Sequence, residues 1–340
     1  MIAMGAMVST SPHFETLSRR AALLGAGALA ACASPLPPVP VKGPADLDAN
    51  AFIMADGARL PYRAWLPDGA PRAVVVALHG FNDSRDAWEL PAPIFAAAGI
   101  AVYAYDQRGF GGAPSRGMWA GHPSMVADAA EITELLRRRH PGSELVVMGE
   151  SMGGAVAMCL AVSDQAPAGA RYVLLAPAVW GRARMNIFMR AGLWLAANII
   201  PSVSPNRPPP GMRIVPTDNM EAWISHSRNP LTLRGARFDT LRGLVDLMDA
   251  ALASAKGFPA TALFLYGGND MLIPQEATRT VWRALPKATT RRAYYPTGHH
   301  LLPRDLGRAV PIGDITGWIL DANHPIPAEA AAEKWQTLQD

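Results

Sequence analysis

The sequence has few cysteines, no strong excess of charge of either sign and no short repeat. Cys32 and Cys159 are the two cysteines among 340 residues, which excludes a disulfide framework and a zinc site built from several cysteines. The 31 basic residues nearly balance the 28 acidic ones. No basic run carries interleaved aromatic side chains, so we expect no nucleic-acid partner. The lack of a recurring period excludes repeat, collagen and coiled-coil architectures.

The N-terminal part has the pattern of an export signal. Arg19 and Arg20 precede an uncharged stretch over 21–31, which is too short to span a bilayer core of ~30 Å but suits the apolar region of a secretory signal. The stretch ends in Leu29-Ala30-Ala31-Cys32, which resembles the lipobox of bacterial lipoproteins. In that family the cysteine is lipidated and becomes the first residue of the mature chain.

This N-terminal pattern predicts an exported protein with a lipid anchor. The expected order is a signal peptide over 1–31, a lipidated Cys32 and a proline-rich tether over 32–50. Such a protein faces the periplasm and is held at the membrane by its lipid. The alternative is a short apolar tail that contains a cysteine by chance.

From about residue 51 onward, short apolar runs alternate with longer amphipathic stretches. Half of all residues are hydrophobic, which suffices for a sizeable buried core. The compact apolar runs predict strands at Ala73–Leu78, Ala101–Tyr105, Leu145–Met148, Tyr172–Leu175, Thr261–Tyr266 and Ala293–Tyr295. The amphipathic stretches predict helices at Trp88–Ala98, Ser124–Arg139, Met152–Val162 and Gln275–Leu285. This alternation predicts a doubly wound, mostly parallel α/β sheet.

Two parts of the chain depart from that alternation. Ala51–Met54 and Leu60–Leu66 are expected to form a leading antiparallel hairpin. Between Leu175 and Thr261 no convincing strand pattern occurs, which predicts an inserted helical cap. The expected organisation is an α/β core over 51–178 and 257–325, a helical cap insert over 179–256 and a C-terminal tail over 326–340.

A serine motif lies between a predicted strand and a predicted helix. Gly149-Glu150-Ser151-Met152-Gly153 has the spacing G-x-S-x-G. In a sharp strand-to-helix turn the serine adopts a strained conformation, and the flanking glycines remove Cβ atoms that would collide. The motif therefore predicts that Ser151 is a nucleophile presented at the edge of the sheet.

An acyl-transfer serine needs a base, an orienting carboxylate and an oxyanion hole. Asp270 follows one predicted strand, and the pair His299-His300 follows the next. The order Ser151, Asp270, His300 is the order that α/β-hydrolases use. Phe81 follows an earlier strand, and its backbone N–H is expected to form the oxyanion hole with that of Met152.

These motifs together resemble one branch of a known family. The chain from about 51 to 320 is similar to the monoacylglycerol lipase and lysophospholipase branch of the α/β-hydrolases. The residues that carry the resemblance are His79-Gly80-Phe81-Asn82, Asp106–Gly111, Gly149–Gly154, Asp270 and Gly298–Asp305. The resemblance implies ester hydrolysis through an acyl-enzyme, no cofactor and a lid over the active site. The loop after Gly111 departs from the family pattern, since no small polar residue follows it directly.

The resemblance also favours one histidine of the pair as the base. Related enzymes carry a glycine, a variable residue, the catalytic histidine and then Arg-Asp four and five residues later. Gly298 lies two residues before His300, and Arg304-Asp305 lie four and five after it. His300 is therefore the expected base, and a shift of the match by one residue would make it His299.

The functional expectation is a serine hydrolase that cleaves a lipid-like carboxylic ester of the monoglyceride or lysophospholipid type. The alternatives are an acyltransferase that uses the same acyl-enzyme, a catalytically idle lipid-binding lipoprotein and a prolyl-type aminopeptidase. The insert shows no acidic cluster suited to a substrate ammonium. The other histidines lack metal-ligand spacing, so we expect no metal site.

Two further expectations concern side-chain surroundings. Arg108 is expected to pair with a nearby carboxylate such as Asp106 rather than to contact substrate. The apolar stretch over 185–200 is expected either to pack inside the cap or to form a lid that faces lipid.

Overall fold

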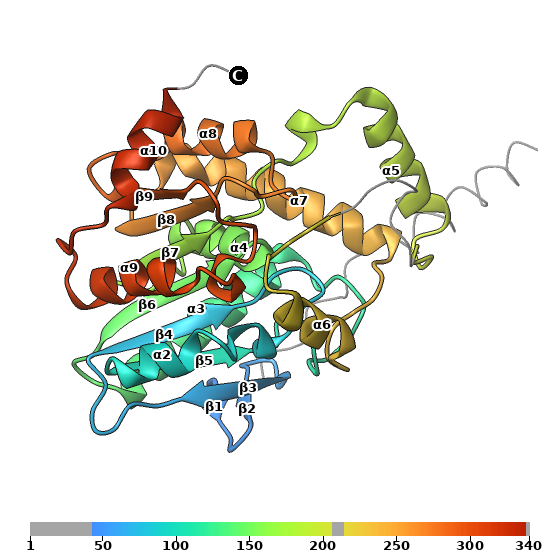
Figure 1. Ribbon diagram of the computed structural model, residues 1–340. Coiled ribbons are helices and arrows are strands. Elements are labelled where there is room, and N and C mark those ends of the chain that lie inside the picture. Colours follow the sequence, from blue (N-terminus) through green and yellow to red (C-terminus); the bar gives the residue numbers. More distant parts are fainter. Residues whose placement is uncertain (1–42, 206–213, 338–340) are drawn as a thin grey trace, which may run out of the picture.

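A nine-stranded sheet runs through the centre of the protein (Figure 1). The computed structural model describes residues 43–205 and 214–337. The predicted signal peptide, Cys32 and most of the tether lie outside these described residues. The strands are β1 (Asp46–Leu47), β2 (Ala51–Ile53), β3 (Arg59–Trp65), β4 (Ala73–Leu78), β5 (Ile100–Tyr105), β6 (Glu144–Glu150), β7 (Arg171–Leu175), β8 (Ala262–Gly267) and β9 (Thr290–Tyr295).

The sheet is mixed, with a parallel majority. Its order is β1-β2-β3-β5-β4-β6-β7-β8-β9. Strands β5, β4, β6, β7, β8 and β9 pair in parallel, whereas β1, β2 and β3 join them through antiparallel pairs. This is the α/β-hydrolase arrangement, and both the doubly wound sheet and the leading hairpin are confirmed.

Helices cover both faces of the sheet because β4 to β8 are apolar on both sides. In β4, Val74 and Val76 point into one hydrophobic core, and Val75 points into the other. The first core packs against α3, α4, α7, α8 and α10, and the second against α2 and α9. The helices are α2 (Ala92–Ala97), α3 (His122–Arg139), α4 (Met152–Ala161), α5 (Ile187–Ile199), α6 (Met220–Arg228), α7 (Phe238–Ser254), α8 (Gln275–Ala284), α9 (Ala309–Leu320) and α10 (Ala328–Gln336).

The segment predicted as a helical cap insert contains α5, α6 and α7. In Figure 1, α5 and α6 lie beside the edge of the sheet at which the parallel strands end. Helix α7 joins this group to the core, because it packs against both α4 and α5. Within the described ranges, no helix has the length and apolar character needed to cross a bilayer.

The C-terminal part differs from the expected tail. Residues 328–336 form α10, which packs along β9. The ring of Trp335 is buried and stacks on Tyr294 with the ring centroids 4.7 Å apart. An amphipathic helix of this length gains its stability from such packing, which local sequence propensity does not reveal. The prediction also omitted β1 and α9.

Candidate active site

Ser151 occupies a strained turn between β6 and α4. Its backbone has φ 53° and ψ −112°, a conformation that a residue with a Cβ rarely adopts. A Cβ at Gly149 would lie 2.2 Å from the carbonyl oxygen of Gly153, and one at Gly153 would lie 2.3 Å from that of Leu78. The backbone can therefore make this turn only with glycine at both positions, as the motif predicts.

His300 and Asp270 form a buried hydrogen-bonded pair. His300 Nδ1 lies 2.8 Å from Asp270 Oδ2, and both residues are buried. The backbone N–H groups of Leu272 and Ile273 donate to Asp270 Oδ1 at 2.7 and 2.9 Å. These bonds fix the carboxylate, so that its other oxygen orients the imidazole.

The surroundings of His300 favour its charged form. Burial lowers the pKa of His300, but the charge and hydrogen bond of Asp270 outweigh it and raise that pKa above its usual range. An imidazole in this setting can take up a proton readily. His299 lies elsewhere, with its Nδ1 3.4 Å from Asp305 Oδ2. The structure thus pairs His300, rather than His299, with Asp270.

Ser151 and His300 line the same cavity, which has a volume of about 670 Å³. Most of its wall is apolar, and its polar side chains gather near Ser151. The apolar side chains of the wall are Phe81, Ala178, Trp180, Ile214, Pro216, Trp223, Leu233, Leu244, Met248, Leu272, Ile273 and Leu301. The cavity lies between the core and the predicted cap insert, and it suits a ligand with an extended apolar part.

The two expected oxyanion-hole residues flank the nucleophile. Phe81 lines the cavity, and Met152 is the first residue of α4, where a backbone N–H has no partner within its own helix. The loop that carries Phe81 is held by His79, whose Nδ1 lies 2.8 Å from the carbonyl oxygen of Gly80. His79 Nε2 accepts a hydrogen bond from the backbone N–H of Gln107 at 3.1 Å. Burial lowers the pKa of His79, so this imidazole is neutral.

A buried charge cluster, which sequence reasoning missed, links three segments of the site. Arg304 Nη2 donates to Asp83 Oδ2 at 2.6 Å and to Glu150 Oε1 at 2.8 Å. Asp83 belongs to the Phe81 loop, Glu150 directly precedes Ser151, and Arg304 follows His300 by four residues. All three side chains are buried. Their positions beside the motifs were the only sequence signal available.

One guanidinium in this cluster serves two carboxylates, and they respond differently. Burial opposes ionisation of Asp83, but the charge of Arg304 and the hydrogen bond with His226 together outweigh it and hold the pKa of Asp83 well below its usual range. Burial raises the pKa of Glu150, although Arg304 opposes that shift. Asp83 is therefore the firmly ionised partner of Arg304.

His226 connects this cluster to the cap. Its Nδ1 lies 3.4 Å from Asp83 Oδ1, and its ring stacks on Trp223 with the centroids 5.2 Å apart. Both residues belong to α6 and line the cavity. Helix α6 thus brings an imidazole and an indole to the polar end of the substrate space.

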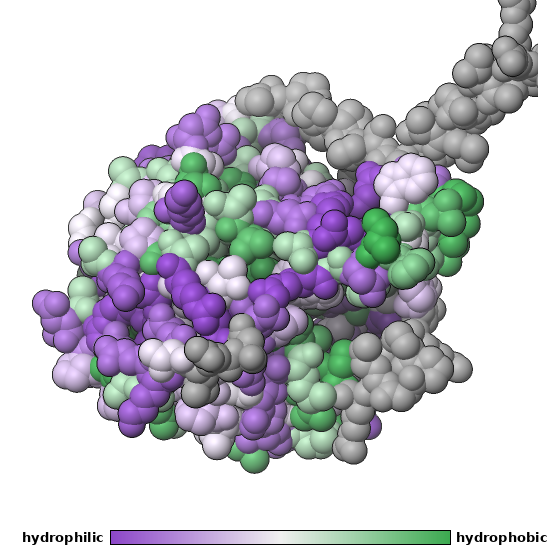
Figure 2. Space-filling view, turned by 90° about the horizontal axis from the view of Figure 1, so that it is seen from above, coloured by the Kyte–Doolittle hydropathy of each residue, from purple (hydrophilic) through white to green (hydrophobic). Residues whose placement is uncertain are grey.

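Helix α5 differs from the rest of the site because most of its side chains are exposed to solvent. Of its thirteen residues only Ala197 is buried, and Phe188 and Trp194 are 83% and 63% exposed. Hydrophobic side chains gather over this helix on the right of Figure 2. The expectation that this stretch packs inside the cap is therefore wrong for most of its side chains.

Arg108 has partners other than the expected one. It pairs with Asp128 at 2.7 Å and with Asp56 at 2.6 Å. The carboxylate of Asp106 instead pairs with Arg85 and accepts hydrogen bonds from the backbone N–H groups of Arg85 and Gly112.

Comparisons with known proteins agree with this geometry. The family described as "Serine aminopeptidase, S33" matches residues 69–307. A monoacylglycerol lipase of Mycolicibacterium smegmatis is 26% identical over 290 residues, which cover 80% of this chain and 96% of the relative. A human monoglyceride lipase is 24% identical over 265 residues, which cover 76% of this chain and 85% of the relative.

Solved structures show the same fold. The monoacylglycerol lipase of Paleococcus ferrophilus has a TM-score of 0.64 and 22% identity, covering 77% of this chain and 98% of its own. A monoglyceride lipase of Saccharomyces cerevisiae, solved with a substrate analogue, has a TM-score of 0.65 and 19% identity, covering 86% of this chain and 100% of its own.

Proposed function

The chain belongs to the serine aminopeptidase S33 family of α/β-hydrolases, and we propose that within this family it hydrolyses monoglycerides through an acyl-enzyme. Its monoacylglycerol lipase relatives support the broader assignment to the serine ester hydrolases of lipids. The proposal rests on one observation. Ser151 and His300 line one largely apolar cavity, and Asp270 is hydrogen-bonded to His300 Nδ1.

In the proposed reaction, Ser151 Oγ attacks the ester carbonyl carbon while His300 takes the hydroxyl proton. The carbonyl oxygen becomes an oxyanion, which accepts hydrogen bonds from the backbone N–H groups of Phe81 and Met152. The intermediate collapses when His300 gives the proton to the leaving alkoxide, and the acyl group stays on Ser151. His300 then takes a proton from water, which attacks the acyl carbon; when the intermediate collapses, His300 returns the proton to Ser151 Oγ and the fatty acid is released.

The charges around the cavity favour a monoglyceride over a lysophospholipid. No lysine or arginine occurs among its lining residues in the described ranges, whereas Asp83 and Glu150 do. Arg304 offsets one of these two charges, so a phosphate head group would meet an excess of negative charge and no lining cation, which is unfavourable in a cavity of low polarity. A neutral glycerol can instead form hydrogen bonds with His226.

The rival reactions differ from hydrolysis in what they require of the site. An acyltransferase would exclude water and pass the acyl group to an alcohol. An aminopeptidase would need a free carboxylate for the substrate ammonium, but Asp83 and Glu150 both contact Arg304. A lipid-binding protein without activity would leave Ser151 unreactive, despite its strained backbone.

We also propose that the protein is exported and anchored through Cys32. This rests on the arginine pair, the apolar stretch over 21–31 and the lipobox-like Leu29-Ala30-Ala31-Cys32. Two or more acyl chains hold a protein stably on a membrane. We expect wild-type protein in the membrane fraction of a bacterial host. We expect Cys32→Ala to be released from the membrane or to remain as an unprocessed precursor. Soluble, unlipidated wild-type protein would contradict it.

The function is tested with a fluorophosphonate probe and two substrates in parallel. Wild type is expected to be labelled, to hydrolyse monooleoylglycerol and to act far more slowly on lysophosphatidic acid, whose phosphate carries no cation of its own. Ser151→Ala should lose labelling and turnover by several orders of magnitude, because the triad acts as a unit. Ser163→Ala, just beyond α4, is the matched control and should keep both.

Each contrary result has its own meaning. Hydrolysis by clean Ser151→Ala at more than a few per cent of wild type would refute the nucleophile. Equal rates on the two lipids would refute the head-group argument. An ester product formed with added alcohol, in place of free fatty acid, would favour the acyltransferase.

A further inference from the structure

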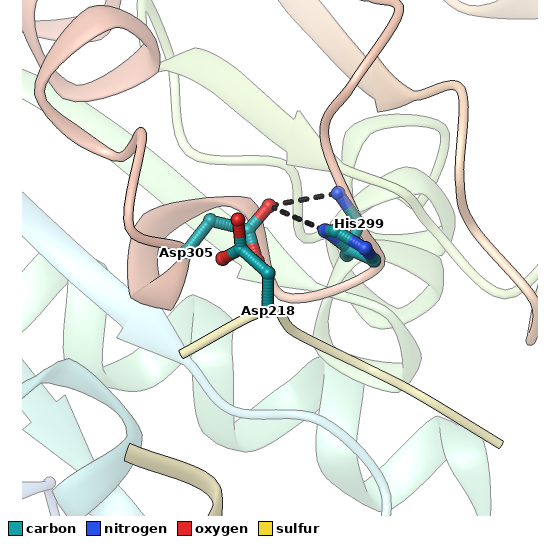
Figure 3. A group of neighbouring side chains, drawn as sticks. All are labelled: Asp218, His299 and Asp305. Carbon is teal, nitrogen blue, oxygen red and sulfur yellow. Dashed lines mark hydrogen bonds and ion pairs between the residues drawn. The ribbon is translucent and has the colours of Figure 1, made fainter. Parts of the chain in front are cut away.

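Three side chains from two segments meet beside the loop that carries His300 (Figure 3). His299 directly precedes His300, and Asp305 ends the same loop. Asp218 comes from the segment that leads into α6. One nitrogen or oxygen atom of each lies within 4.8 Å of the others.

A buried carboxylate oxygen of Asp305 is independent evidence that this cluster binds a ligand. It is 4% exposed, and its Oδ2 accepts a hydrogen bond from the backbone N–H of His299 at 2.7 Å. Its Oδ1 is also buried but has no hydrogen-bond partner among the described residues. A buried carboxylate oxygen without a donor is costly, and native structures seldom leave one so.

The surroundings increase that cost. Figure 3 shows the carboxylates of Asp218 and Asp305 facing each other beside the His299 ring. Arg308 lies near but donates to the backbone carbonyl of Asp305 at 3.1 Å rather than to its carboxylate. Two carboxylates at this spacing repel each other unless a cation or a proton lies between them.

We propose that Asp218, His299 and Asp305 bind a divalent cation of the zinc or manganese class. One imidazole nitrogen and two carboxylate oxygens form a donor set of intermediate hardness, which suits these ions. Calcium prefers six to eight oxygen ligands and is disfavoured by the imidazole. Asp218 is exposed, so water can complete the coordination.

The cation would join two segments that already touch. The backbone N–H of Leu301 donates to the carbonyl oxygen of Pro216 at 2.9 Å, and that of Leu306 donates to Asp218 Oδ1 at 2.8 Å. A bridge between Asp218 and Asp305 ties the chain leading into α6 to the loop that carries His300. The ion acts by holding this loop and takes no part in the substrate reaction.

The test is a binding measurement on the whole chain, made without an affinity tag and after treatment with a chelator. Zn²⁺, Mn²⁺ and Ca²⁺ are titrated separately by calorimetry into the Ser151→Ala protein. Binding is then read independently of ester hydrolysis, so failure of the proposed function cannot mimic failure of the site. One equivalent of Zn²⁺ or Mn²⁺ is expected to bind and to raise the Tm, with Ca²⁺ weaker.

A matched pair of variants locates the ion. Asp218→Asn should weaken the affinity about tenfold or more, since even residues behind the ligands change it by 10–100-fold. Asp321→Asn is the control, because Asp321 is also exposed and its carboxylate also accepts a backbone N–H, that of Asn323. His299→Asn serves as a second test of the site.

Three results would overturn the proposal. They are no saturable binding of any of the ions, equal binding by wild type and Asp218→Asn, or an equal loss in Asp321→Asn.

Discussion

The catalytic edge of the sheet, where the parallel strands end, and helix α5 lie on the same side of the protein. They differ in which side chains they bury and which they expose. At the edge, Arg304, Asp83 and Glu150 are buried charges, each with a hydrogen-bonded partner. In α5, large apolar side chains are left in solvent. At the edge, paired charges and turns that require glycine hold the reacting groups in place. Helix α5 instead leaves an apolar surface exposed, to which another apolar molecule can bind.

This contrast explains how one chain could process a water-insoluble ester. Proton transfer and oxyanion binding require groups held to within fractions of an ångström. Capture of a fatty chain requires only apolar area. We therefore expect substitutions at the edge to act on every substrate, and substitutions on α5 to act on long-chain substrates alone.

After Ser151→Ala, the largest effect is expected at the base. His300→Ala should lower kcat/KM on a short soluble ester by ~10²–10⁴-fold, because general acid-base catalysis contributes in that range. His299→Ala is the comparison variant and should lose far less activity, since its ring lies beside Asp305 and away from Asp270. A severe loss in His299→Ala with a mild loss in His300→Ala would reverse the assignment and contradict the geometry.

Next in size is the loss of Arg304. Arg304→Met leaves Asp83 and Glu150 buried without their common cation, and breaking a buried ion pair by removing one partner costs ~3–5 kcal/mol. We expect a loss of that order in the free energy of unfolding, measured with urea. Arg308→Met, which removes a half-buried guanidinium that bonds a backbone carbonyl, should change it little.

A double variant separates charge from shape. If unpaired charge causes the loss, Arg304→Met combined with Glu150→Gln should be more stable than Arg304→Met alone. No recovery would show that Arg304 acts through packing, and the view of the edge as a charge-fixed structure would then fail.

A smaller effect is expected in the pH profile. The base must be neutral to accept the serine proton, so kcat/KM falls as the pH drops through the pKa of His300. Glu150 raises that pKa and Arg304 lowers it, both by their charge. Glu150→Gln removes the negative charge, and the acid limb should move to lower pH. An unmoved limb would mean that Glu150 carries no charge in that range.

Local patterns in the sequence were sufficient for strands β2 to β9 and for the strand-to-helix turn at Ser151. Alternation and apolar runs depend on neighbouring residues, and the glycine requirement at 149 and 153 is a local steric one. The pairing of His300 with Asp270 could be expected because both follow parallel strands, whose ends meet at one edge.

What could not be predicted depends on contacts between distant residues. Asp83 and Arg304 are 221 residues apart, and nothing local marks them as partners. The same holds for Arg108, whose expected partner Asp106 is near in sequence while its real partners Asp56 and Asp128 are not. Helix α10 was taken for a tail because its stability comes from Trp335 packing on the core.

The smallest and most selective effect is expected on α5, at Trp194. Its side chain is 63% exposed, and surface substitutions away from special features change stability by about ±0.5 kcal/mol. Trp194→Ala should therefore leave the Tm nearly unchanged and leave the rate on a short soluble ester intact. Hydrolysis of a long-chain monoglyceride should fall several-fold, because apolar area that meets the acyl chain or its lipid surface is lost.

Leu66→Ala is the matched control, since Leu66 is 56% exposed and belongs to the loop after β3. Equal losses on short and long esters would show that Trp194 supports the site itself, and the division between a fixed edge and an adaptable apolar helix would not hold.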